Sequence, residues 1–187
     1  PNDGDVLFAL ALIALEQGKD LQAQQHLERM VRWNRRSGEA HYYLGEIAER
    51  RLDKKTALQE YAQAGEGYEF IPAQARIVSI LADEGLWKEA RDHLNKLRTQ
   101  KPEHRQRLML MEAQLLADRG QEREALDFLD SILVREPENV ELLYYRAMTG
   151  QRFGQLDILE ADLRKVIELD PRNADALNAL GYTLTDQ

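Results

Sequence analysis

The sequence predicts an all-α fold built from repeated helix-turn-helix units. Three kinds of residue recur along the chain at the same spacing. They are Gly85, Gly120 and Gly154, then Pro102, Pro137 and Pro171, and finally Ala23, Ala57, Ala90 and Ala125. Each series repeats every 33 to 35 residues. A fixed period of about 34 residues is typical of an array of helical pairs.

The markers divide the chain into five repeats and a half repeat. Their predicted ranges are 4–37, 38–70, 71–105, 106–139, 140–173 and, for the half repeat, 174–187. Apolar residues within them follow the spacing of amphipathic helices, as Leu129, Ile132 and Leu133 do. The chain starts without Met, and Pro1 stands where the closing proline of an earlier repeat would fall. We therefore expect a single array that is a fragment of a longer protein.

Small residues mark the places where paired helices are expected to cross. On the first helices these are Ala11, Gly45, Val78, Ala113, Ala147 and Gly181, and the recurring alanines face them from the second helices. The recurring glycines, with Gly18, suit the tight turns between helices because glycine adopts a positive φ at little cost. The prolines are expected to end the second helices.

Three features depart from this pattern. Leu159 occupies the small position of the fifth repeat, which predicts wider helix spacing there, and Leu52 replaces the turn glycine of the second repeat. Gly65 and Gly67 lie near the end of the second repeat, so we expect its last helix to end early and the junction near 65–71 to be irregular.

These patterns resemble the tetratricopeptide repeat (TPR) family. The motif W-x2-L-G-x2-Y…A-x3-F…P is approximated by His41-x2-Leu44-Gly45-x2-Ala48 with Ala57-x3-Tyr61, by Leu177-x2-Leu180-Gly181-x2-Leu184, and by Ala125-x3-Leu129 with Pro137. The resemblance covers essentially the whole chain. It implies a right-handed superhelical solenoid whose concave groove is lined by the first helix of each repeat.

The resemblance places a set of partly aromatic residues in that groove. The predicted partner-binding residues are Phe8, Leu12, Tyr42, Tyr43, Glu46, Arg76, Ser79, Met111, Gln114, Tyr144, Tyr145, Met148 and Tyr182. Tyr offers a large contact area at low entropic cost, and Met packs adaptably. Packing between repeats is the alternative role of these tyrosines. A carboxylate clamp like that of heat-shock co-chaperones is not predicted, because in the first register only Arg76 matches it.

Basic residues cluster in two places. These are Arg29, Arg32, Arg35 and Arg36, and then Lys96, Arg98, Lys101, Arg105 and Arg107. Positive charge is favoured at helix C-termini by the macrodipole, which accounts for much of this clustering. The functional alternative is a docking site for an acidic partner surface.

Composition excludes several classes of function. The 187 residues include no cysteine, which rules out disulfides, a thiolate nucleophile and Cys-ligated zinc. The formal net charge of −8 disfavours broad nucleic-acid binding, and no apolar stretch approaches the ~20 residues of a membrane span. The four histidines lack metal-binding spacings, although Glu89 and His93 are four residues apart, and no nucleophile or phosphate-binding motif is present. We predict no catalytic residue, no metal and no cofactor.

The stretch from Ile167 to Leu184 resembles, more narrowly, TPR lipoproteins of Gram-negative bacteria. That resemblance implies a location on the periplasmic side of the outer membrane, with a lipid anchor upstream. Without the resemblance, the expected location is the cytoplasm. It also implies an adaptor that brings cell-wall hydrolases to a carboxyl-terminal processing protease. The sequence thus favours a non-enzymatic protein-binding scaffold. A regulatory or substrate-recruiting TPR region of a larger enzyme and a self-assembly module remain the alternatives.

Overall fold

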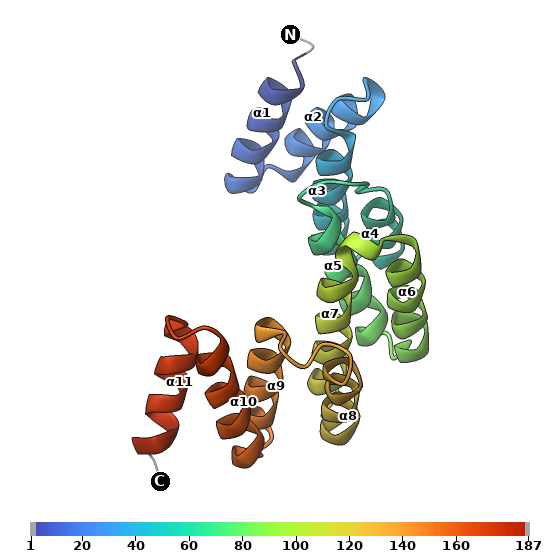
Figure 1. The fold of residues 1–187 in the computed structure, drawn as a ribbon. Coiled ribbons are helices and arrows are strands. Elements are labelled where there is room, and N and C mark those ends of the chain that lie inside the picture. The colour runs from blue at the N-terminus through green and yellow to red at the C-terminus, as the bar shows by residue number, and fades with distance from the viewer. Residues whose placement is uncertain (1–2, 186–187) are drawn as a thin grey trace. The chain divides into compact units, whose positions relative to one another are not determined.

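The computed structural model describes residues 3–185, which fold into helices joined by short turns. In this part of the chain there are eleven α-helices, one short 3-10 helix and no strand. The α-helices are α1 (Gly4–Glu16), α2 (Asp20–Arg32), α3 (Ser37–Arg50), α4 (Lys54–Ala62), α5 (Phe70–Asp83), α6 (Trp87–Gln100), α7 (Arg105–Asp118), α8 (Glu122–Leu133), α9 (Val140–Arg152), α10 (Leu156–Leu169) and α11 (Ala174–Thr185). Figure 1 shows them as consecutive hairpins, so the predicted all-α fold class is confirmed.

The first helix of each pair begins close to a predicted repeat start. Those starts, at 4, 38, 71, 106, 140 and 174, lie within one residue of the first residues of α1, α3, α5, α7, α9 and α11. Pro1, offered above as the end of an earlier repeat, lies outside the described residues, as do 186 and 187.

The helices form two compact units, Pro1–Arg105 and Gln106–Gln187, called unit 1 and unit 2 below. In unit 1, one apolar cluster joins α1, α2 and α3, and a second joins α3, α4 and α5. In unit 2, a larger cluster runs from α7 to α11 and includes Leu142, Leu159 and Leu163. Neighbouring repeats therefore share their cores within each unit, as expected of a repeat array.

The turns between paired helices have the conformation that their sequence predicts. Gly18, Gly85, Gly120 and Gly154 have φ between +68° and +76°. Leu52 adopts the same left-handed conformation, with φ of +61°, although its side chain adds a steric cost that glycine avoids. Leu52 is 84% exposed, so no packing compensates for that cost.

The predicted small residues lie at the contacts where paired helices cross. Ala23, Ala57, Ala90 and Ala125 are completely buried, and Ala11, Ala113 and Ala147 are buried equally on the first helices. Gly45 lies against the ring of Tyr61. Close approach of these helices therefore depends on the absence of larger side chains.

The expectation of wider spacing at Leu159 is wrong. The helices α9 and α10 pack at least as closely as α1 with α2 and α3 with α4, and Leu159 is fully buried in the unit 2 core. Gly150 supplies the close approach, because a Cβ built there would lie 3.3 Å from the Ile158 side chain and 3.1 Å from the Gln155 carbonyl oxygen. A glycine one turn beyond Ala147 thus replaces the missing small residue on α10.

The irregular junction between the second and third repeats is confirmed. The helix α4 has nine residues, whereas the other α-helices have 12 to 14. It ends at Ala62, before Gly65 with φ of +69° and Gly67 with φ of +156°. Both values lie outside the range that other residues adopt easily, so the glycines permit this early end.

Candidate partner-binding surfaces

The thirteen predicted partner-binding residues all keep solvent-accessible surface. Seven of them, from Phe8 to Ser79, belong to unit 1, and six, from Met111 to Tyr182, belong to unit 2. None falls in the buried class, although buried residues alternate with them along the same helices. We call the side presented by α1, α3 and α5 the first-helix face of unit 1, and that presented by α7, α9 and α11 the first-helix face of unit 2.

Four aromatic rings form a row at the first-helix face of unit 1, three of them on first helices and the fourth, Tyr61, beneath them on α4. Phe8 on α1 meets Tyr43 on α3 edge to face, with ring centroids 5.5 Å apart. The ring centroids of Tyr43 and Tyr42 are 5.2 Å apart, and those of Tyr42 and Tyr61 of α4 are 5.7 Å apart. These separations are those of favourable aromatic pairs. We call Phe8, Tyr43, Tyr42 and Tyr61 the aromatic ladder.

The structure brings three predicted residues together in this ladder and adds one that the sequence analysis did not assign to the site. Tyr61 is completely buried and supports Tyr42 from below the surface. In the sequence it is identifiable only as part of the repeat motif Ala57-x3-Tyr61, and the structure places it beneath the site.

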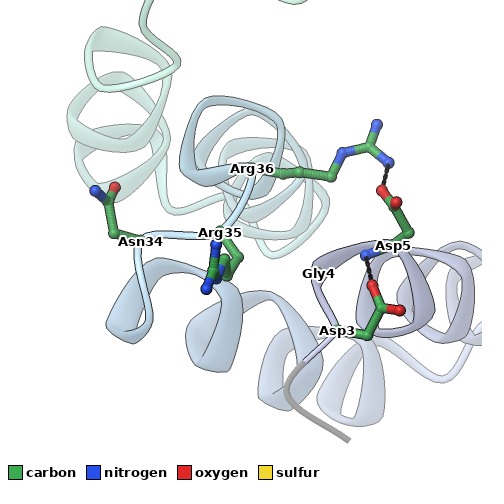
Figure 2. A pocket seen from close by; sticks show the side chains of 6 residues that line it. All are labelled: Asp3, Gly4, Asp5, Asn34, Arg35 and Arg36. Carbon is green, nitrogen blue, oxygen red and sulfur yellow. Dashed lines mark hydrogen bonds and ion pairs between the residues drawn. The ribbon is translucent and has the colours of Figure 1, made fainter.

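Arg36 closes one end of the ladder. Its guanidinium carbon lies 4.1 Å from the centroid of the Phe8 ring, a cation–π geometry. Its Nη1 donates to Asp5 Oδ1 at 2.9 Å, as Figure 2 shows, and its Nε donates to Glu39 Oε1 at 3.0 Å. Arg36 adopts a left-handed backbone conformation, with φ of +46°. These partners fix the side chain in place.

A polar pocket lies beside this end of the ladder (Figure 2). It has a volume of about 500 Å³ and is lined by Asp3, Gly4, Asp5, Asn34, Arg35 and Arg36. The start of α1 and the turn before α3 form it together. Docking of an acidic partner is the functional alternative for this basic cluster, and one of its guanidinium groups, that of Arg36, is already paired with carboxylates of the chain itself.

The other end of the ladder is closed by a hydrogen-bonded trio. Arg76 of α5 forms a bidentate ion pair with Glu49 of α3, with Nε 3.0 Å from Oε2. The Tyr61 hydroxyl donates to the same Oε2 at 2.8 Å. The bond from Arg76 holds the pKa of Glu49 below its usual range, helped by the Tyr61 hydroxyl. Arg76, the residue that matches the clamp in the first register, is therefore committed to an internal carboxylate.

A second cavity adjoins this trio. It has a volume of about 380 Å³ and is lined by Glu46, Glu49, Arg50, Tyr61 and Arg76. Burial raises the pKa of the Tyr42 phenol to about 12, and the neighbouring Glu46 carboxylate adds to the shift through its charge and a hydrogen bond. Burial also raises the pKa of Tyr43. Both phenols thus stay neutral at physiological pH.

The first-helix face of unit 2 has a different, more polar centre. The Tyr145 hydroxyl donates to Gln114 Oε1 at 2.6 Å, and the Gln114 amide donates to Asp118 Oδ1 at 2.7 Å. Arg152 Nη1 donates to the same Asp118 oxygen at 2.8 Å. This network joins α7 to α9 and includes two of the predicted residues. Burial raises the pKa of Tyr145 to about 12.

The remaining predicted residues lie along these faces as single side chains. Tyr144 and Met148 of α9 are half-buried against the unit 2 core, and Tyr182 of α11 is 74% exposed. Leu12, Ser79 and Met111 are partly exposed on α1, α5 and α7. Their role in binding stays a prediction.

Two of the four histidines form hydrogen bonds to side chains of the chain itself. His93 Nε2 lies 2.7 Å from Gln74 Oε1, and His41 Nδ1 lies 2.7 Å from Glu60 Oε2. Within residues 3–185, no three His, Asp or Glu side chains gather closely enough to hold a metal ion. No helix in that range is both long enough and apolar enough to cross a membrane.

Comparison with known proteins identifies the fold. No family model matches the chain. A TPR repeat-containing protein of Pseudomonas aeruginosa is 41% identical over 148 residues, which are 79% of this chain and 25% of that protein. The chain therefore spans about a quarter of the length of that relative.

Solved TPR structures align with most of the chain. A thermophilic TPR protein of Thermus thermophilus has a TM-score of 0.56 at 18% identity, with 98% of this chain and all of that one covered. YrrB, described as a TPR protein with an unusual peptide-binding site, has a TM-score of 0.50 at 17% identity, with 95% and 92% covered. At these identities the likeness shows the fold alone.

Proposed function

We propose that this chain, a tetratricopeptide-repeat protein, is a non-enzymatic scaffold that binds a peptide segment or helix of partner proteins on its first-helix faces. The observation that carries the proposal is the aromatic ladder. Phe8, Tyr43 and Tyr42 lie side by side on adjacent first helices and keep accessible surface. Aromatic side chains of this kind dominate the binding energy of protein interfaces.

The ladder is arranged before any partner arrives. Arg36 and the Glu49–Arg76 pair hold its two ends, and the buried Tyr61 supports its centre. A surface that is already ordered loses little conformational entropy on binding, so more of the contact energy appears as affinity. The ordered ladder therefore supports a recognition role in addition to a packing role.

A finer proposal concerns the partners and the location. The likeness of residues 167–184 to Gram-negative TPR lipoproteins supports an adaptor on the periplasmic side of the outer membrane. Such an adaptor would deliver cell-wall hydrolases to a carboxyl-terminal processing protease. Two binding faces in one chain would raise the effective concentration of one partner near the other. Fractionation of cells producing the whole protein, with detection of the protease in the same complex, tests this proposal.

The scaffold proposal is tested with a display library of random linear peptides panned on the immobilised chain. We expect selected peptides to bind the wild type and to lose affinity in Tyr42→Ala or Tyr144→Ala, each with unchanged helicity. Tyr68→Ala is the matched control, because Tyr68 is 97% exposed between α4 and α5. Failure to select any peptide, or equal binding by all three variants, would reject the first-helix faces as the binding site.

Self-association is a second candidate, favoured by the outer side of α1. Val6, Leu10 and Ile13 recur at helical spacing and are 41%, 43% and 50% exposed. An apolar stripe of this kind is suited to contact with a second copy. Sedimentation at increasing concentration should show association in the wild type and its loss in Leu10→Lys. Leu21→Lys, at a 71% exposed position on α2, is the control.

A further inference from the structure

We infer that the aromatic ladder of unit 1 binds a cationic side chain, Arg or Lys, of the partner segment, held between the Tyr42–Tyr43 pair and the Glu46 carboxylate. The inference rests on the proposed function, since it concerns the same face, and it adds the chemistry of the residue that this face selects.

The cations bordering the site are already neutralised. Arg76 is paired with Glu49, and Arg50 Nη1 donates to Asp20 Oδ1 at 3.1 Å. Glu49 therefore has its charge satisfied, and neither guanidinium is left to attract an acidic ligand. The charge that remains on this side of the cavity is that of Glu46.

Glu46 is placed to receive a positive charge. Its side chain is partly exposed and lines the 380 Å³ cavity. Among the described residues it forms no ion pair, and the Tyr42 phenol beside it stays neutral. Arg50 and Arg76 line the same cavity, but both are paired with other carboxylates. Since Tyr42 stays protonated, its hydroxyl can donate to Glu46 without competing for the cation. A carboxylate beside a ring face offers both a Coulombic and a cation–π partner.

Carboxylates also outnumber cations around Tyr43. Glu39, Glu46 and Glu69 all act on the Tyr43 phenol, against the single positive charge of Arg36. Arg36 is itself bonded to Glu39 and Asp5. More carboxylates than cations therefore lie near Tyr43, which disfavours an anionic ligand at this point.

The structure already contains one example of the proposed contact. The Arg36 guanidinium stacks on Phe8 while two carboxylates accept its hydrogen bonds. Phe8 is the ladder ring next to Tyr43. The Tyr43–Tyr42 pair and Glu46 repeat these elements, an aromatic surface and a carboxylate, and within residues 3–185 no cation–π contact to either tyrosine is formed. A partner's Arg or Lys supplies the missing component.

The test uses the whole chain with selectively labelled tyrosines and two small probes, N-acetylarginine amide and N-acetylcitrulline amide. Citrulline has nearly the shape of arginine without its charge. We expect the arginine probe to shift the Tyr42 and Tyr43 ring resonances saturably, and the citrulline probe to bind at least about fivefold more weakly. Equal binding of the two probes would overturn the inference.

Two variants assign the contact. Glu46→Gln keeps an acceptor for Tyr42 but removes the charge, and should reduce arginine binding to the citrulline level. Glu16→Gln, at the exposed end of α1, makes the same charge change and should leave binding unaltered. If Glu46→Gln disturbs the fold, Tyr43→Leu tests the ring contribution with an apolar surface retained. Unchanged arginine binding in the folded variant refutes the assignment.

The outcome can be separated from that of the scaffold proposal. Peptides that bind in a Tyr42-dependent way but show no preference for Arg or Lys would refute the cation site and leave the scaffold standing. Arginine-specific binding with no selectable peptide would support the cation site and refute the scaffold.

Discussion

The ring of Tyr61 lies directly on the backbone of Gly45, where α4 crosses α3. A Cβ built on residue 45 would be 2.7 Å from both Cδ1 and Cε1 of the ring. Tyr61 is completely buried and its hydroxyl is bonded to Glu49, so the ring cannot move aside. The same ring supports Tyr42, which links this contact to the ladder above it.

The first prediction follows from that contact. Gly45→Ala should destabilise unit 1 by about 1–3 kcal/mol, the usual cost of overpacking a well-filled core. It should also shift the Tyr42 ring resonances. Chemical denaturation followed by circular dichroism measures the loss.

Gly181→Ala is the matched control, because among the described residues nothing beyond its chain neighbours and its own helix backbone lies within 4 Å of a Cβ built there. It should stabilise the helix by about 0.5–1 kcal/mol, because alanine has the higher helix propensity. A gain at both glycines would mean that Tyr61 does not require a glycine beneath it.

The second prediction concerns the left-handed residue in the turn between α3 and α4. Leu52→Gly should stabilise the chain by about 0.5–1 kcal/mol, since a left-handed leucine is strained and this one is exposed. Gly85→Leu is the reciprocal change at φ of +76° and should destabilise it. Thermal melts of the two variants should shift in opposite directions; shifts of the same sign would contradict this account.

The third prediction concerns a buried ion pair in unit 2. Arg146 Nε and Nη2 lie 2.7 Å and 2.6 Å from the two carboxylate oxygens of Asp162, and Arg146 also bonds Asp130. The Asp162 side chain is only 4% exposed. Arg146→Met should therefore cost about 3–5 kcal/mol, because it leaves a buried carboxylate unpaired.

The exposed pair between Arg164 and Glu160 provides the comparison. Arg164→Met should cost less than about 0.5 kcal/mol, as is usual for surface pairs four residues apart on a helix. Urea denaturation of both variants measures the difference. Similar losses would show that burial of Asp162 does not set the strength of its pair.

The fourth prediction concerns pH. Burial lowers the pKa of His93, and the charge of Lys96 lowers it further. Because the folded value lies below the ordinary value of about 6.5, the contribution of His93 is complete above pH 6.5 and is lost as the pH falls toward the folded value. The melting temperature should therefore decrease as the pH is lowered from about 7.5 to about 5.5, a range that spans the ordinary pKa of about 6.5.

His93→Gln isolates this contribution. The amide can still donate to Gln74 but does not titrate in this range. Its melting temperature should change less with pH than that of the wild type. Parallel curves for the two proteins would assign the pH dependence to other groups.

The regular features of the fold could be predicted because each depends on one residue type. The turn glycines require a positive φ, and the alanines at 23, 57, 90 and 125 require close packing, so both appear in the sequence as a period. The early end of α4 was predictable in the same way from Gly65 and Gly67.

Features that depend on compensation between residues could not be predicted. The period predicts a small residue at the position of Leu159 on α10, but the close approach of the two helices is made possible by Gly150 on α9. The period also gives no sign that Arg36 stacks on Phe8 or that Arg76 is committed to Glu49. These contacts join residues 28 and 27 positions apart through side-chain geometry that a repeat pattern does not specify.

The central claim is that partners bind the first-helix faces. Its most direct test is photo-crosslinking with benzoylphenylalanine placed singly at Tyr43, Tyr144, Leu21 or Val134, in the presence of a selected peptide. The last two positions are 71% and 82% exposed and lie on α2 and just after α8, away from the first helices. The account predicts adducts from position 43 or 144 and none from 21 or 134. Adducts mainly from 21 or 134 would contradict it.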